Sequence, residues 1–296
     1  MKTPNDMSAS VRQRLLTRSK SENRPFNELL QYYAMERFLF RLSLSEHARH
    51  YILKGALMLR AWNSPVYRPT MDIDLLGRTG NAEGNITSHF RDILAVDVDP
   101  DGLTFDSRSI VTERITQGAE YEGVRVRFRG ALGTARISMQ IDIGFGDIVY
   151  PGPEIAALPC ILISPVPTLL GYSRESAIAE KFEAMIKLGQ LNSRMKDFYD
   201  IWLLSRHFEF ELMNLRKAIR LTFKHRGTEL SYPIEAFSSE FISSRQSTWA
   251  AFCRRLKQDH LPESFKVVVA EVALFLDPVI KGVSGHSIWK PFSAWS

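Results

Sequence analysis

The spacing of apolar side chains predicts helices at the start of the chain. Apolar residues recur at three- and four-residue intervals over residues 25–42, directly after a proline, which is the pattern of an amphipathic helix. A short basic helix is expected over residues 8–21 and another helix over residues 55–62.

The pattern changes to alternation in the middle of the chain. Polar and apolar residues alternate over residues 71–76, 124–129 and 137–143, as in strands with one exposed face. Residues 158–163 are a further strand candidate, and residues 85–94 are expected to form a helix between strands. We therefore predict a mixed α/β sheet between about residues 50 and 165.

Helical spacing returns after Pro167 and continues to about residue 276. Five helices are expected there, over residues 175–188, 194–205, 211–223, 247–257 and 263–276. The proline-containing loop 164–168 is the expected boundary between a first domain, residues 1–165, and a second domain, residues 166–296. The expected fold class is α/β of the α+β kind, a small mixed sheet with flanking helices followed by a helical C-terminal domain.

Composition excludes several classes of protein. The 296 residues are 45% hydrophobic and 24% charged, as in a globular protein rather than a tail, a fibre or a membrane protein. Lys and Arg outnumber Asp and Glu by 38 to 33, a mild bias toward anionic partners. The longest uncharged stretch, residues 155–173, contains three prolines and a glycine, so it is expected to be a strand and a loop rather than a membrane span.

The two cysteines indicate a reducing compartment. Cys160 and Cys253 lie far apart and outside any spacing typical of zinc ligands or of a disulfide framework. The N-terminal residues contain no apolar segment of the kind found in signal peptides. A cytoplasmic location without a membrane partner is therefore the expectation.

Two carboxylates in the alternating segment 71–76 are the first candidates for chemistry. Asp72 and Asp74 lie two positions apart and therefore on one face of a strand, while Ile73 and Leu75 point into the core. Two acids this close repel each other unless a cation lies between them, and hard oxygen ligands suit Mg²⁺. An isolated Asp-x-Asp is usually a pair of solvated acids, so this interpretation depends on the surrounding sequence.

Residues on both sides of the pair support a phosphate-binding metal site. Upstream, Lys54, Gly55 and Ala56 open the expected helix, where a glycine permits close backbone approach and helix N-terminal amides can bind a triphosphate. Downstream, Asp142 falls on the polar face of its strand, because alternate apolar residues fill the other face. Metal-assisted phosphoryl transfer uses such a set of carboxylates. Asp142 is the preferred third carboxylate, with Asp147 as its rival.

Four segments carry a resemblance to a known family: YILKGALML, RPTMDIDLL, AIAEKFEAMIKLG and SRMKDFYDIWLL. Together they resemble the AbiEii/AbiGii family of nucleotidyltransferase toxins, relatives of the DNA polymerase β-like superfamily, over roughly residues 10 to 210 and in the family's order. The resemblance implies a nucleotidyltransferase sheet and transfer of nucleotides from an NTP to an RNA. It further implies the 3′ end of tRNA as acceptor, Mg²⁺ as cofactor, arrest of growth, and a separate antitoxin protein of a type IV toxin–antitoxin system.

The resemblance also assigns roles to particular positions. Asp72 and Asp74 match the metal-binding pair, Lys181 matches the lysine motif, and Asp197 matches the acid of the final motif, with Asp200 one turn later. Under the resemblance, Lys181 neutralises charge on the triphosphate in the transition state.

The chain departs from the superfamily pattern before the acid pair. The superfamily often has Gly-Ser where this chain has Gly55 and Ala56, and 17 positions separate Gly55 from Asp72. Arg68 and Thr70 directly precede the acids and are candidates to contact nucleotide or acceptor, although an exposed turn requires neither.

The residues of the second domain have a simpler alternative interpretation. Lys181 shares its helix with Glu183 and Lys187, so it can be one member of a set of surface ion pairs. Asp197 and Asp200 can equally pair with neighbouring basic residues as a solvated network.

Three arginines suggest an RNA contact. Arg125, Arg127 and Arg129 line the polar face of one strand, where they can follow an RNA backbone. Pairing with acids on a neighbouring strand is the alternative. The chain has no aromatic signature of an RNA-recognition motif, so base-specific contacts are not predicted.

Three functions remain open at this stage: the transferase described above, a catalytically silent module that binds RNA or a partner protein, and a transferase that modifies a small cationic antibiotic. The presence of Asp72, Asp74, Asp142 and Lys181 argues against a silent module. A pocket for a cationic drug is expected to be acidic, whereas several arginines lie near the predicted site.

Overall fold

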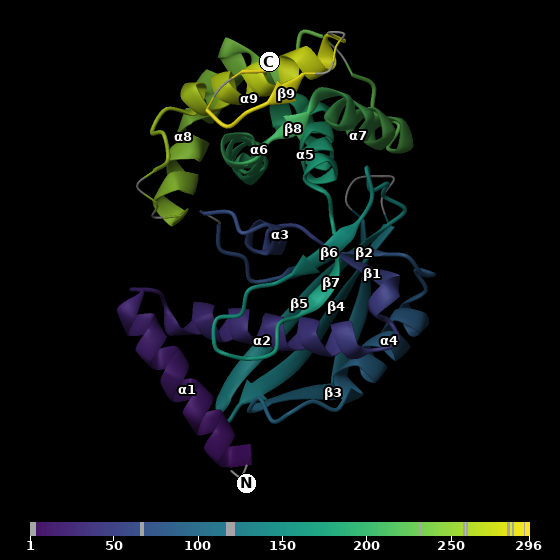
Figure 1. Cartoon of the computed structure of the whole chain (residues 1–296), viewed down its shortest axis with the longest axis vertical. Coiled ribbons are helices and arrows are strands. Elements are labelled where there is room, and N and C mark those ends of the chain that lie inside the picture. Colours follow the sequence, from purple (N-terminus) through teal and green to yellow (C-terminus); the bar gives the residue numbers. More distant parts are fainter. Residues whose placement is uncertain are drawn as a thin grey trace. The chain divides into compact units, whose positions relative to one another are not determined.

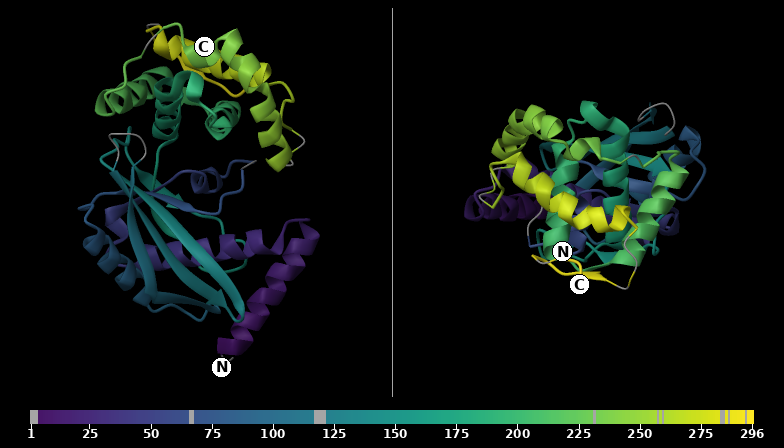
Figure 2. Two further views of the ribbon diagram at one scale, coloured as in Figure 1. Left: turned by 180° about the vertical axis from the view of Figure 1, so that it is seen from behind. Right: turned by 90° about the horizontal axis from the view of Figure 1, so that it is seen from above.

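The computed structural model describes residues 4–65, 68–116, 122–230, 232–256, 258, 260–282, 285, 287–292 and 294–296. The chain divides into two compact units (Figures 1 and 2). The first contains the residues up to Gly146 together with Glu154–Gly171, and the second contains Asp147–Pro153 and Tyr172–Ser296.

The first unit is built on a mixed sheet, which has seven strands within the described residues. The strands are β1 (Tyr51–Lys54), β2 (Ile73–Gly77), β3 (Leu103–Thr116), β4 (Glu122–Leu132), β5 (Ala135–Phe145), β6 (Glu154–Ala157) and β7 (Thr168–Gly171), in the spatial order β3-β4-β5-β2-β1-β7-β6. β2 lies between β1, to which it is antiparallel, and β5, to which it is parallel. β2 is therefore a central strand.

Helices α2 and α4 pack on one face of this sheet. The helices of the unit are α1 (Pro4–Ser21), α2 (Phe26–Leu44), α3 (Leu57–Ala61) and α4 (Glu83–Ala95), with a 3₁₀ turn η1 (Ala48–His50). The rings of Phe38 on α2 and Phe90 on α4 stack with centroids 5.5 Å apart, and both contact Phe128 on β4. Seen from behind, the strands lie in front of α2 (Figure 2).

The pleat of β4 and β5 separates an apolar face from a polar one. Alternate residues of these strands are buried: Val124, Val126, Phe128, Ile137, Met139, Ile141 and Ile143. Because successive side chains of a strand point to opposite faces, the polar residues between them lie on the face away from α2 and α4. Asp142 and Arg125 are on this polar face.

The second unit is mainly helical. It contains α5 (Arg174–Leu188), α6 (Met195–His207), α7 (Leu212–His225), α8 (Ser239–Leu256) and α9 (Phe265–Ile280), 3₁₀ turns η2 (Gly189–Leu191) and η3 (Glu235–Phe237), and a small sheet of β8 (Phe210–Glu211) and β9 (Ile288–Trp289). Buried aromatic rings join the helices. Phe198 on α6 contacts Phe241 on α8 and Phe265 on α9, with centroids 5.9 and 5.1 Å away.

Most of the elements predicted from the sequence are confirmed. The alternating segments form β2, β4 and β5, and each predicted helix coincides with one of α1 to α9. Strands β1, β3, β6 and β7 were not predicted individually. The mixed α/β class with a sheet and flanking helices is also confirmed.

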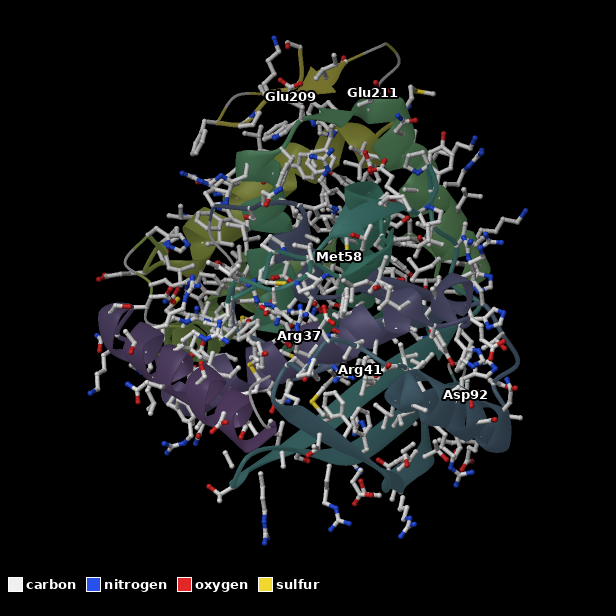
Figure 3. The ribbon with its side chains drawn as sticks, turned by 60° about the horizontal axis from the view of Figure 1, so that its bottom comes forward. Arg37, Arg41, Met58, Asp92, Glu209 and Glu211 are labelled. Atoms are coloured by element: carbon white, nitrogen blue, oxygen red, sulfur yellow. The ribbon has the colours of Figure 1, made fainter. Side chains whose placement is uncertain are left out.

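The strand predicted over residues 158–163 is wrong, because this segment is a loop between β6 and β7. Buried charged side chains satisfy its backbone. The carboxylate of Glu36 accepts hydrogen bonds from the amide of Ile161 at 3.0 and 2.9 Å, and Arg60 donates to the carbonyl of Pro159 at 2.8 Å. Arg37, labelled on α2 in Figure 3, donates to the carbonyl of Pro165 in the same loop at 2.6 Å. These side chains therefore bond the backbone groups that a neighbouring strand would bond if the segment were in the sheet.

The units differ in two places from the expected division after residue 165. β7 pairs with β1, so the first unit extends to Gly171. The segment Asp147–Pro153 belongs to the second unit, where the amide of Tyr150 donates to Ser176 at 2.8 Å and the hydroxyl of Ser173 donates to Tyr150 at 2.6 Å.

Within the described part of the chain, no helix has the length and apolar character that crossing a membrane would require.

Candidate active site

The turn after β1 brings the backbone against a carboxylate. Gly55 follows Lys54, the last residue of β1, and has a φ of +71°. A Cβ atom at Gly55 would lie 2.0 Å from Oδ2 of Asp74, which is far inside van der Waals contact. Glycine is therefore required here both for its backbone conformation and for the space that Asp74 occupies.

The helix that follows Gly55 is short. α3 contains five residues, and the amides of Met58 and Leu59 donate back to the carbonyls of Gly55 and Ala56, both at 3.2 Å. Ala56 is buried. A role of Lys54, Gly55 and Ala56 in binding a triphosphate stays a prediction.

Asp72 and Asp74 lie at the start of β2. The hydroxyl of Thr70 donates to Oδ1 of Asp72 at 2.5 Å, and the amide of Thr70 donates to the hydroxyl of Tyr32 at 3.0 Å. Thr70 was predicted to contact nucleotide or acceptor, but its buried hydroxyl is directed to Asp72 and orients that carboxylate. Arg68 lies half-buried in the loop before β2.

Gln31 of α2 fixes the same end of β2 and was not singled out from the sequence. Its side-chain amide donates to the carbonyls of Met71 and Ser138, both at 3.1 Å, and so joins the segment entering β2 to β5. The only signal in the sequence was a polar residue on the buried side of an amphipathic helix.

Four charged residues lie side by side across four strands. Lys54 of β1 is paired in register with Asp74 of β2, Asp74 with Asp142 of β5, and Asp142 with Arg125 of β4. We call Lys54, Asp74, Asp142 and Arg125 the charged row. Because neighbouring strands are about 4.8 Å apart, the two carboxylates of the row are adjacent and each has a basic residue on its other side.

Arg125 holds Asp142 with two hydrogen bonds. Nε and Nη2 of Arg125 each donate to one oxygen of Asp142 at 2.7 Å. These bonds raise the pKa of the Arg125 guanidinium above its ordinary value, aided by the charges of Asp142, Glu113 and Asp72 and opposed by burial. Both oxygens of Asp142 are therefore engaged by a cation that stays charged.

The donor atoms fit a divalent ion at Asp72 and Asp74. Carboxylate oxygens are the ligands that Mg²⁺ prefers, and Oδ2 of Asp74 lies against the backbone of Gly55. Among the described residues, Asp72, Asp74 and Asp142 are not gathered into a ready cluster of ligands. Each oxygen of Asp142 accepts one hydrogen bond from Arg125 and keeps a second lone pair, with which Asp142 can join such a site.

Asp147, the rival third carboxylate, belongs to a cluster in the second unit. Arg226 lies 2.9 Å from Asp147, 3.5 Å from Glu180 and 2.8 Å from Glu183. Burial by itself lowers the pKa of the Arg226 guanidinium, but Glu180, Asp147 and Glu183 outweigh burial and raise it. Asp142 is the carboxylate that pairs in register with Asp74 within the first unit. Glu183 was expected on an exposed face, which is wrong, since it is 2% exposed.

Lys181 is held by two buried acids of α6. Its Nζ lies 2.7 Å from Oδ2 of Asp200 and 3.7 Å from Oδ1 of Asp197. Nε of Arg194 is 2.6 Å from Oδ2 of Asp197. Asp197 is fully buried, and within the described residues its oxygens accept no hydrogen bond of normal geometry. The alternative of a solvated network is therefore wrong for Asp197 and Asp200.

All three strand arginines pair with carboxylates, which is the alternative that the sequence left open. Besides the pair of Arg125 with Asp142, Arg127 lies 2.8 Å from Glu113 and Arg129 lies 3.2 Å from Asp106. Arg127 and Arg129 keep 44% and 76% of their side chains exposed, so contact with RNA stays a prediction for these two.

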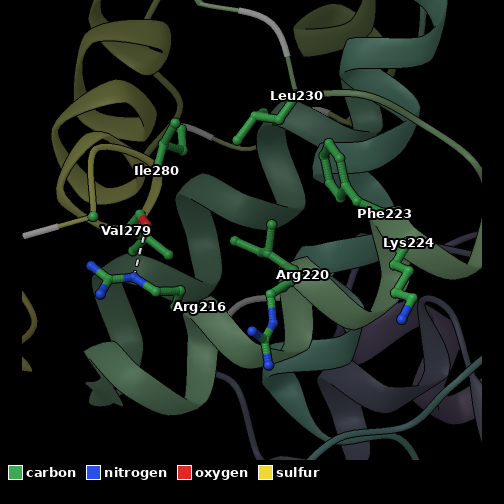
Figure 4. Close-up of a pocket in the computed structure, with 9 residues that line it drawn as sticks. Arg216, Arg220, Phe223, Lys224, Leu230, Val279 and Ile280 are labelled. Atoms are coloured by element: carbon green, nitrogen blue, oxygen red, sulfur yellow. Dashed lines mark hydrogen bonds between the residues drawn. The ribbon is translucent and has the colours of Figure 1, made fainter.

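The second unit also contains an apolar pocket of about 340 Å³ between α7 and α9 (Figure 4). Arg216, Arg220 and Lys224 lie at its edge, and Arg216 donates to the carbonyl of Val279 at 3.1 Å. None of the site residues predicted from the sequence lines this pocket.

Comparison with known proteins gives the class and the family. Residues 37–271 match the model of a family of nucleotidyltransferases, and this match covers most of the chain. The protein belongs to the AbiEii family, described as nucleotidyl transferase AbiEii toxin, type IV TA system.

Two solved structures from Helicobacter pylori are similar to this chain. JHP933 has 14% sequence identity and a TM-score of 0.47, with 86% of this chain and 93% of JHP933 covered. A second protein, assigned to the nucleotidyltransferases, has 14% identity and a TM-score of 0.46, with 84% and 95% covered. Likeness at this level supports no inference about activity. A search among curated proteins gives no match.

Replacing Gly55 by Ala is expected to destabilise the protein and displace Asp74. The new Cβ atom meets Oδ2 of Asp74, and the positive φ is strained for alanine, so we expect a loss of roughly 1–3 kcal/mol in the free energy of unfolding. This loss is measured by unfolding the wild type and the variant with denaturant. Gly80→Ala is the matched control, because nothing lies within 4 Å of a Cβ there. Equal stability of the two variants would contradict the close approach.

Proposed function

We propose that this protein is a Mg²⁺-dependent nucleotidyltransferase toxin that transfers nucleotides from an NTP to an RNA, with the 3′ end of tRNA as acceptor, and so blocks growth. The family gives the reaction class and the type IV toxin–antitoxin context, with an antitoxin as partner. The observation that carries the proposal is the charged row, in which Asp74 lies between Lys54 and Asp142 and beside Gly55.

In this proposal, the first unit holds the metal and the phosphates. Asp72 and Asp74 hold Mg²⁺, which when bound neutralises phosphate charge and activates the attacking hydroxyl. Thr70 keeps Asp72 oriented through its hydrogen bond. Lys54, with the backbone at Gly55 and Ala56, and Arg68 bind the nucleotide.

Asp142 is the third carboxylate in this scheme. Its bonds with Arg125 hold it in place beside Asp74. Arg125 therefore acts on Asp142 rather than on RNA.

Residues of the second unit supply a further cation. The carboxylates of Asp200 and Asp197 pair with the ammonium group of Lys181 and restrict its side chain. We propose that Lys181 acts on the triphosphate, with Asp197 and Asp200 as the residues that orient it. A charge fixed before the reaction stabilises a transition state more effectively than a mobile one, because no reorganisation is needed.

The acceptor of the nucleotide can be an RNA or a small cationic molecule. Arg127 and Arg129 are exposed cations on the polar face of the sheet, which favours a polyanion over a cationic drug. An RNA acceptor and a small cationic acceptor differ in their dependence on salt.

Asp72→Asn and Asp74→Asn are expected to lower nucleotide transfer by roughly 10²–10³ or more while the fold is kept, since each removes one charged ligand. The assay incubates the purified protein with each labelled NTP, Mg²⁺ and total cellular RNA, and measures label in RNA. Asp99→Asn, in an exposed loop, is the control. Wild-type turnover in either variant would sink the central assignment.

Lys181→Ala is expected to lower kcat at saturating NTP by roughly 10² or more, the scale for losing one group that stabilises transition-state charge. Lys181→Arg should rescue poorly, because a planar guanidinium replaces a compact ammonium. Lys187→Ala, on the exposed part of the same helix, is the matched control. A change in thermal stability with unchanged kinetics would instead make Lys181 a structural ion-pair residue.

Replacing Arg127 and Arg129 by Gln is expected to weaken RNA binding and to flatten its log-log salt dependence by about 1.4, since each phosphate contact on a single strand contributes about 0.7. RNA affinity is measured across a salt series at constant free Mg²⁺. The double variant Arg254→Gln and Arg255→Gln, in the last turn of α8, removes the same charge elsewhere. Equal slopes for the wild type and the first variant would exclude these contacts, and undetectable RNA binding would favour a small-molecule acceptor.

A further inference from the structure

Three histidines from different segments of the first unit meet at one point. His47 directly precedes η1, His50 lies in η1, and His89 lies on α4. One ring nitrogen of each lies within 4.8 Å of the others. The rings of His47 and His89 stack with centroids 4.0 Å apart, and His50 lies 5.3 Å from His89.

Hydrogen bonds engage one nitrogen of two of these rings and leave the other nitrogen available. Nε2 of His47 is 2.9 Å from Oδ2 of Asp92, and Nδ1 of His89 is 3.0 Å from the hydroxyl of Tyr51. Asp92 is labelled on α4 in Figure 3. A metal-binding histidine usually has this arrangement, with one nitrogen bonded to a carboxylate or hydroxyl and the other directed at the ion.

Two ring nitrogens of the cluster provide separate evidence for a ligand. Nδ1 of His47 and Nδ1 of His50 are buried and have no hydrogen-bond partner among the described residues. His47 as a whole is 7% exposed and His89 is 8% exposed. Ring stacking explains why the histidines are close but leaves these two nitrogens without any interaction that compensates for lost water.

The surroundings of His89 favour its uncharged form. Burial lowers the pKa of His89, and the neighbouring His47 and His50 lower it further, against the opposite effect of Asp92 and Glu46. A neutral imidazole is the form that binds metal ions.

We propose that His47, His50 and His89 form a binding site for a divalent transition-metal ion, with Zn²⁺ as the expected ion. Imidazole nitrogens suit Zn²⁺ and its neighbours in the series, whereas Mg²⁺ prefers oxygen. The fourth position is open to water.

Binding the ion requires the ligand nitrogens to move closer together. Zn–N bonds of about 2.0–2.1 Å in a tetrahedron place ligand nitrogens about 3.3 Å apart. The nitrogens now lie within 4.8 Å of one another and the His47 and His89 rings are stacked, so binding the ion requires these rings to rotate until their nitrogens converge.

The site is distinct from the carboxylate site of the same unit. Tyr51, which bonds His89, is the first residue of β1 and pairs with Gly77, whereas Lys54 at the other end pairs with Asp74. The three residue steps along β1 separate the two ends by about 10 Å. Zn²⁺ would therefore join the end of α2, η1 and α4 around the base of β1, as a structural ion.

The test uses the full chain without a histidine tag, stripped of metal with a chelator and titrated with Co²⁺ and Zn²⁺. We expect about one equivalent of Co²⁺ to give the visible absorption of a four-coordinate centre and Zn²⁺ to displace it. Bound Zn²⁺ should also raise Tm, because it binds the folded chain. Absence of the Co²⁺ absorption in the wild-type protein would overturn the proposal.

Substitutions at the proposed ligands and at control positions test where the ion binds. His50→Phe keeps the ring volume and should abolish the absorption, while His225→Phe, at an exposed position, should not. Asp74→Asn should keep it, since that residue belongs to the carboxylate site. Asp92→Asn should weaken binding by roughly 10–100-fold through the orientation of His47. Unchanged affinity in both folded His50→Phe and Asp92→Asn would overturn the proposal, and Asp92→Asn decides alone if His50→Phe does not fold.

Discussion

The position of Asp74 against the backbone of Gly55 is the constraint on which the site depends. β2 is central, so Asp74 has Lys54 on one neighbouring strand and Asp142 on the other, in register. The pleat turns these side chains to the polar face while Ile73 enters the core. A shift of register by one residue would bury the acids and expose the apolar side chains, so the packing of the core against α2 also fixes the chemistry of the opposite face.

Ion pairs of low exposure recur in both units and perform different tasks. Glu36 and its partners replace sheet neighbours for the loop between β6 and β7, and Arg226 gathers Asp147, Glu180 and Glu183 in the second unit. Buried pairs add little net stability, because desolvation offsets their attraction, but they specify geometry. In the same way, the two hydrogen bonds from Arg125 hold the carboxylate of Asp142 in one orientation.

The first unit presents two kinds of donor set at the two ends of β1. Carboxylates beside Lys54 suit a hard ion that carries phosphate, whereas imidazoles beside Tyr51 suit a softer ion that stays in place. Each set is oriented by a hydrogen bond from its surroundings, Thr70 on Asp72 and Asp92 on His47. The chemistry of the ligands therefore separates the two sites more clearly than distance does.

The sequence by itself determined the elements whose pattern is local. Periods of two and of 3.6 residues gave β2, β4, β5 and the helices, and the same alternation placed Asp72, Asp74 and Asp142 on a polar face. Tertiary structure decided which distant residues meet: Arg125 with Asp142, Asp147 with Arg226, and His47 with His89, 42 positions later. It also turned residues 158–163 into a loop, because the carboxylate of Glu36 bonds an amide 125 residues away, and no local pattern contains such a contact.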